Sequence, residues 1–308
     1  SQTVMKVVPF GSLEASVEVP SNKIGFVKVP LGCPKQLAKC MNDDIQLIKF
    51  GVLSPHEIRS LSVVEIVCHD ILEKGIPKHG GLSDLRLGTI DRQFRCHTCK
   101  NSAVECPGHY GHIELVHPVY HINFIKTVVK VLQTICVSCS RCKLGEVRSG
   151  ERGAKTFKAR HEMCKVKTKC AYCETIQPKI VCDKHEIICE GEEKTVMTAK
   201  ECLDILKRIP DEDIKSMGFC VDNRPENLIF ETLLVPPPHV RPSVNMDSAL
   251  RSQDDLTHKL SEIVKTNNIL KKLDTSSSSY KATCELLQYH VTTYIDNNTS
   301  GISPATSP

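Results

Sequence analysis

The sequence has no tryptophan, and aromatic residues make up only 5% of its 308 residues. This composition disfavours both a surface that binds nucleic acid by stacking bases and a large aromatic ligand pocket. No apolar run approaches the roughly 18 residues that a membrane-spanning helix needs, so we expect no membrane partner. A glycine-rich phosphate loop, a nucleophile elbow and a Ser-His-Asp order of residues are also missing. These absences argue against the commonest nucleotide-binding and hydrolytic enzymes.

Cysteine, in contrast, is abundant, with 17 residues. Residues Ser1 to Lys6 carry no charged-then-apolar signal pattern, so we expect a reducing compartment and free thiols. Clustered cysteines then predict metal ligands, whereas scattered ones such as Cys68 and Cys202 predict small core residues. With 40% hydrophobic residues, 25% charged residues and a net charge of +4, the rest of the chain is typical of a soluble globular protein.

Helical patterns dominate the secondary structure that we expect. Capping boxes start helices at Ser54 and Thr198, and apolar residues recur at helical spacing in residues 122–135, 254–273 and 286–295. An apolar run at 228–235 predicts a strand, and Gly80 to Arg92 predicts a structured loop. The sequence therefore indicates helices with short strands and long irregular connections.

The first cysteine cluster combines two ligand pairs on short turns. Cys96 and Cys99 are followed after six residues by Cys106-Pro107-Gly108-His109. Two such pairs complete a closed tetrahedron of three thiolates and one imidazole, which is typical of a structural zinc site. His109 repeats the two-residue gap and is therefore a better ligand than His112.

The second cluster begins with Cys136-Val137-Ser138-Cys139, and spacing leaves its partner pair open. Spacing alone favours Cys170 and Cys173, which would make a four-cysteine zinc ribbon. Cys142, Cys182 and Cys189 are then expected to stay free thiols. A zinc deaminase, a third possibility, needs His112, Glu114, Cys136 and Cys139 in one site, but Ile135 stands where that signature has proline.

Five motifs, in order along the chain, carry a family resemblance. They are Phe50-Gly51-Val52-Leu53-Ser54-Pro55, the loop Gly80 to Arg92, Cys106-Pro107-Gly108-His109-Tyr110-Gly111-His112, Val235-Pro236-Pro237-Pro238-His239-Val240-Arg241-Pro242-Ser243 and Asp254-Asp255-Leu256-Thr257-His258-Lys259-Leu260. Together they resemble the N-terminal clamp region of the largest subunit of eukaryotic RNA polymerase II. The resemblance covers 46–301 and leaves 1–45 unassigned and 302–308 as an unstructured end. It implies an α+β fold: a zinc-stabilised, mainly helical clamp domain with short strands and long irregular loops.

The resemblance also implies two structural zinc ions and their ligands. For the first ion it implies Cys96, Cys99, Cys106 and His109, the same four that spacing selects. For the second it implies Cys136, Cys139, Cys164 and Cys173, because the family places a ligand in a Cys-Lys-x-Lys segment, here Cys164 to Lys167. Cys170 is the alternative to Cys164.

The function implied by the resemblance is to help enclose the DNA template and the transcript, in the nucleus and in contact with other polymerase subunits. The basic segment Lys126 to Lys169, with twelve Lys and Arg against three Glu, would approach the template or the RNA–DNA hybrid; an ordinary solvated face is the alternative. The family's catalytic Asn-Ala-Asp-Phe-Asp-Gly-Asp loop is missing, so we expect magnesium only in that missing part and no nucleotidyl transfer by this chain alone. An independent zinc-binding interaction module is the alternative function.

Overall fold

The structure is a computed structural model that describes residues 51–73, 75–143, 157–165, 169–191, 194–247 and 250–305. The unassigned segment 1–45 and the last residues, 306–308, lie outside this part. Contacts divide the chain into two units. The first combines the residues up to Glu114 with Thr232–Lys272, and the second combines Leu115–Glu231 with Leu273–Thr306. The predicted extent of the domain, 46–301, stays a prediction.

In the first unit, helix α2 (Pro55–Leu61) begins as its sequence predicts. The Ser54 hydroxyl accepts the Glu57 amide, and the Glu57 carboxylate accepts the Ser54 amide in return. The remaining elements are the hairpin β1 (Leu72–Glu73) and β2 (Ile76–Pro77), the 3-10 turn η1 (Leu85–Leu87), the hairpin β8 (Val244–Asp247) and β9 (Leu250–Ser252), and helix α7 (Asp255–Leu270). The core includes fully buried Leu82, Leu87 and Leu260.

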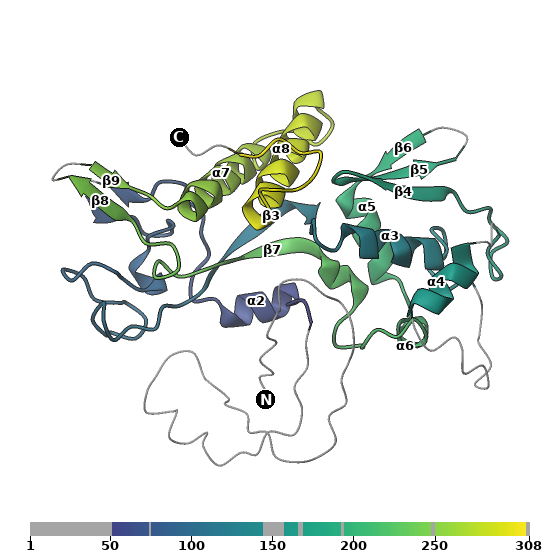
Figure 1. Ribbon diagram of the computed structural model, residues 1–308, viewed down its shortest axis with the longest axis horizontal. Helices are drawn as coiled ribbons and strands as arrows, with labels where there is room; N and C mark the ends of the chain where they lie inside the picture. Colours follow the sequence, from purple (N-terminus) through teal and green to yellow (C-terminus); the bar gives the residue numbers. More distant parts are fainter. Residues whose placement is uncertain are drawn as a thin grey trace, which may run out of the picture. The chain divides into compact units, whose positions relative to one another are not determined.

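The second unit contains most of the helices. They are α3 (Ile125–Thr134), α4 (Phe157–Lys165), α5 (Ala199–Lys207), α6 (Asp211–Ser216), the 3-10 turn η3 (Pro225–Leu228) and α8 (Ser278–Ile295). A three-stranded antiparallel meander of β4 (Lys179–Asp183), β5 (Glu186–Glu190) and β6 (Lys194–Met197) completes the unit (Figure 1). The predicted capping box at Thr198 starts α5.

One further sheet consists of β3 (Gly111–Tyr120) and β7 (Ile229–Val235). The division between the two units falls within both strands. Helices combined with small sheets confirm the predicted α+β class. Among the described residues, no helix has both the length and the apolarity that crossing a membrane requires.

Candidate metal centres

The first candidate centre brings together Cys96, Cys99, Cys106 and His109, whose ligand atoms all lie within 4.8 Å of one another. Cys96 starts a tight turn in which the Thr98 amide donates to the Cys96 sulfur at 3.3 Å. Lys100 closes this turn with a left-handed backbone, φ 63°. Cys96, Cys106 and His109 are buried. The four residues that spacing predicts are thus neighbours in the structure.

The other half of this centre depends on a glycine between its two ligands. Gly108 has φ 80°, and a Cβ at this position would lie 2.7 Å from the Cβ of Pro237. The His109 amide donates to the carbonyl of Leu87 at 2.9 Å. As a result, Nε2 of His109 faces the Cys106 sulfur at 3.7 Å. This leaves Nε2 as the nitrogen that can bind a metal.

The second candidate centre contains Cys136, Cys139, Cys170 and Cys173, again with all four sulfurs within 4.8 Å. The sulfur of Cys136 lies 3.5 Å from that of Cys173, and the sulfur of Cys139 lies 3.7 Å from that of Cys170. Two Cys-x-x-Cys turns therefore face each other across one point. This is the arrangement that spacing favoured.

The same backbone turn recurs at three of the four ligand pairs. In each, the amide of the first cysteine donates to the carbonyl five residues later, and its carbonyl accepts the amide four residues later. The fourth residue after that cysteine always has a left-handed backbone: Lys100 at 63°, Ser140 at 58° and Glu174 at 57°. This turn directs both sulfurs of a pair to one side, where amides can donate to thiolates.

Cys164, the ligand that the family resemblance implies, lies outside the second group. It is a buried residue of helix α4, and a helix does not provide the turn that Cys170 forms with Thr175. Cys170, the alternative that spacing favours, belongs to the four-sulfur group, and the choice between Cys164 and Cys170 as a zinc ligand stays a prediction. Zinc binding at the first and at the second centre stays a prediction.

Two polar side chains support the second group. Gln177 donates to the Cys136 sulfur at 3.1 Å and accepts the Val137 amide at 2.9 Å, which fixes the start of the turn. Lys143 is buried, and burial lowers its pKa, while the nearby thiols of Cys164 and Cys136 act in the opposite direction. Its ammonium group can balance part of the negative charge of four thiolates.

The thiols of the two candidate centres differ widely in pKa. Burial raises the pKa of Cys106 and of Cys139 to about 12. Hydrogen bonds from Thr175, by contrast, lower the pKa of Cys173 to about 6. Thiols this different do not ionise together on their own, whereas a divalent cation bound by all four donors would deprotonate them as a set.

Comparison with known proteins identifies the family. Residues 42–308 match the family model described as RNA polymerase Rpb1, domain 1. The chain belongs to this family. The predicted resemblance to the N-terminal part of the largest polymerase subunit is confirmed.

Archaeal and eukaryotic members of the family are similarly close to this chain. DNA-directed RNA polymerase subunit Rpo1N of Thermococcus celer is 41% identical in an alignment of 283 residues that covers 84% of this chain and 31% of that protein. DNA-directed RNA polymerase II subunit RPB1 of Euplotoides octocarinatus is 38% identical in an alignment of 287 residues that covers 83% of this chain and 60% of that protein. The chain thus spans about a third of the first relative and three fifths of the second.

The deaminase possibility fails within this Rpb1 domain because its residues are engaged elsewhere. Glu114 is held by Arg59 at 2.6 and 2.9 Å and accepts the Thr232 hydroxyl at 3.0 Å. Cys136 and Cys139 are completed by two cysteines instead of by His112. In the part of the chain that the structure describes, the four residues of the deaminase signature are therefore not gathered into one metal site.

A third cluster of metal-ligand types, Cys68, His69 and Asp70, lies in the first unit. The Lys78 ammonium group lies 2.8 Å from the Asp70 carboxylate, and its hydrogen bond to that carboxylate is the main reason that the pKa of Asp70 is lowered. An ammonium group thus already balances the charge that would attract a metal. We assign no metal to this cluster.

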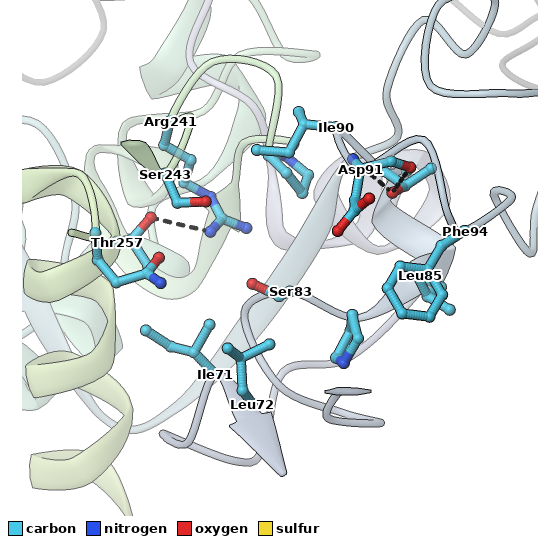
Figure 2. Close-up of a pocket in the computed structure, with 15 residues that line it drawn as sticks. Ile71, Leu72, Ser83, Leu85, Ile90, Asp91, Phe94, Arg241, Ser243 and Thr257 are labelled. Atoms are coloured by element: carbon cyan, nitrogen blue, oxygen red, sulfur yellow. Dashed lines mark hydrogen bonds between the residues drawn. The ribbon is translucent and has the colours of Figure 1, made fainter. Parts of the chain in front are cut away.

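A pocket in the first unit borders the loop 80–92 and the start of α7 (Figure 2). Of the residues that line it, only Arg241 and Asp91 are ionisable. The Arg241 guanidinium is buried and donates to Thr257 at 3.2 Å and to the carbonyls of Pro236 and Leu82. Figure 2 shows the Arg241–Thr257 hydrogen bond on one side and Asp91 on the other. With Arg241 held in this way, the lining offers no pair for acid–base chemistry.

Proposed function

We propose that this chain is a clamp portion of the largest subunit of a DNA-directed RNA polymerase, RNA polymerase II of the nucleus. Membership of the Rpb1 domain 1 family carries this proposal. In this role the chain helps to enclose the DNA template and the RNA–DNA hybrid, and it binds other polymerase subunits. The whole enzyme's chemistry belongs to residues outside this chain, because the magnesium-binding Asp loop is not in its sequence.

Two structural zinc ions hold this portion together. Cys96, Cys99, Cys106 and His109 bind the first ion, and the second ion is bound by Cys136, Cys139, Cys170 and Cys173. Thiolate-rich tetrahedral sets favour zinc over harder cations. All four positions of each set are protein donors, so neither ion has a place for an activated water. When bound, zinc supplies folding free energy to turns that have little core of their own.

The basic surface that would approach nucleic acid lies on α3 and α4, which pack against each other. It has four exposed lysines, two on each helix: Lys126, Lys130, Lys158 and Lys165. Burial is the main cause that lowers the pKa of His161, and the charges of Lys130 and Lys165 lower it further. Both ammonium groups therefore lie near His161. Neighbouring ammonium groups attract phosphates and release counterions on binding.

Affinity purification from the native cell tests the proposal. The gene is tagged at its own locus, so that the protein is recovered as it is made, under mild salt. We expect the second large polymerase subunit to co-purify in stoichiometric amount and the tagged protein to be nuclear by fluorescence. A Cys136→Ser, Cys139→Ser variant is the matched control for loss of zinc support. Recovery as a stable monomer that binds one DNA sequence tightly would support an independent interaction module instead.

A further inference from the structure

Two histidines beside the first metal centre have buried ring nitrogens without a hydrogen-bond partner among the described residues. They are Nδ1 of His109 and both ring nitrogens of His239. Because Nε2 of His109 faces the Cys106 sulfur, a bound metal leaves Nδ1 carrying the proton. A metal-binding histidine almost always donates this second N–H to a carboxylate, a carbonyl or a water. His109 lacks such an acceptor in its immediate surroundings.

His239 is held next to the ligand pair Cys106 and His109 by two glycines. A Cβ on Gly108 would lie 3.0 Å from Nδ1 of His239. A Cβ on Gly88 would lie 3.0 Å from Cε1 of His239 and 3.1 Å from the Cys106 sulfur. Both glycines have left-handed backbones, at 80° and 108°. The imidazole therefore occupies space that side chains at these two positions would fill.

The position of His239 favours a supporting role over direct ligation. Its nitrogens are not part of the four-donor group, whose members all lie within 4.8 Å of one another. Its Nδ1 lies on the Gly108 side of the ring, next in the chain to His109. On either side of Gly108 there is thus a buried ring nitrogen without a partner, one that would donate and one that can accept.

We propose that His239 orients the metal ligand His109 by accepting its Nδ1–H on Nδ1 across one buried water. This inference rests on the proposed zinc site. The hydrogen bond fixes the His109 tautomer with Nε2 free for the metal, and it makes the imidazole a stronger ligand. His239 is thus a positioning residue that the proline-rich segment Val235 to Ser243 brings to the centre. Removing a partner of this kind typically lowers metal affinity by about 10- to 100-fold.

The test compares two variants of similar size, His239→Asn and His239→Leu, with His56→Phe on exposed α2 as the control. The zinc-loaded full chain is titrated with a chelator, and zinc per chain is measured at each step. We expect His239→Leu to lose one zinc at roughly 10- to 100-fold lower chelator. His239→Asn, whose carbonyl can accept the hydrogen bond, should retain it better. Simple apolar packing of the ring would give the opposite order, with leucine better than asparagine.

A second readout follows the His109 proton itself. Nitrogen-15 spectra of the wild type should show Nδ1 protonated and slow to exchange, and exchange should accelerate in His239→Leu while the second zinc stays bound. Equal chelator midpoints and equal exchange for leucine, asparagine and wild type would overturn the inference. A different result would contradict the proposed zinc site itself. In that case the Cys96→Ser, Cys99→Ser double variant would bind as much zinc per chain as the wild type.

Discussion

Asp84 is predicted to stabilise the loop that supports the first metal centre. Its buried carboxylate accepts the Gly80 amide at 2.6 Å, the Arg86 amide at 2.9 Å and the Arg86 guanidinium at 2.7 and 3.0 Å. The turn so formed presents carbonyls of Leu85 and Leu87 to the amides of His97 and His109. Burial alone would raise the pKa of Asp84, but these hydrogen bonds outweigh it and lower the pKa to about 2.

The size of the effect follows from the difference between the pKa values of the folded and unfolded chains. The ordinary pKa of 3.8 falls to about 2, which corresponds to roughly 2 kcal/mol once the exposed part of Arg86 is discounted. Because the folded pKa is depressed, this stability is fully present above pH 4 and is lost as the pH falls from about 4 to about 2. Asp84→Asn should therefore lower the free energy of unfolding by about 2 kcal/mol at pH 7.

Urea unfolding of wild type and Asp84→Asn across pH 7 to 3 measures this difference. Zinc release in acid affects both proteins, so the difference between them isolates Asp84. Asp91→Asn, in the same loop, is the control, because its carboxylate accepts the Gln93 amide near the surface; we expect a change within about 0.5 kcal/mol. An Asp84→Asn difference below about 0.5 kcal/mol at pH 7, or one that grows toward acid pH, would refute the reasoning.

Three further predictions concern the metals and the basic surface. Cys170→Ser should remove one zinc per chain under chelator competition while Cys164→Ala keeps both; the reverse pattern would restore the family-based assignment. Complete chelation should unfold the segment 92–175, because zinc supplies its folding free energy; circular dichroism and protease resistance that survive zinc removal would contradict this. The affinity of the chain for duplex or hybrid nucleic acid should fall steeply with salt, and it should also fall when Lys126, Lys130, Lys158 and Lys165 are all replaced by Glu. Binding that is insensitive to salt would show that this basic surface is an ordinary solvated face.

Local interactions explain which parts of the fold the sequence could predict. The capping boxes at Ser54 and Thr198 involve residues three apart, and both begin helices where expected. The apolar pattern predicts a helix over 286–295, but Ser277 caps α8 by accepting the Tyr280 amide, so this helix already begins at Ser278. The meander β4 to β6 was missed, since its charged residues conceal the alternation that buries Ile187 and Cys189.

In the candidate sites, too, the features that depend on residues close in the sequence could be predicted and the others could not. Paired short spacings, each on one turn, predicted the first group of donors. For the second group, the repeated Cys-x-x-Cys spacing predicted the four sulfurs that lie together, because the backbone turn at Cys170 is the same as the turns at Cys96 and Cys136. The family pattern instead chose Cys164, a helical residue. The motif Val235 to Ser243 contains His239 but does not connect it with a metal centre, because its neighbours Gly88 and Gly108 lie more than a hundred residues away in the chain.

Anomalous scattering at the zinc edge, from crystals of the intact protein, tests the central claim most directly. Two peaks per chain are predicted, at about 2.3 Å from each ligand sulfur and 2.0–2.1 Å from Nε2 of His109. The second peak should lie among Cys136, Cys139, Cys170 and Cys173. A single peak, or a second peak bound by Cys164 in place of Cys170, would contradict the account.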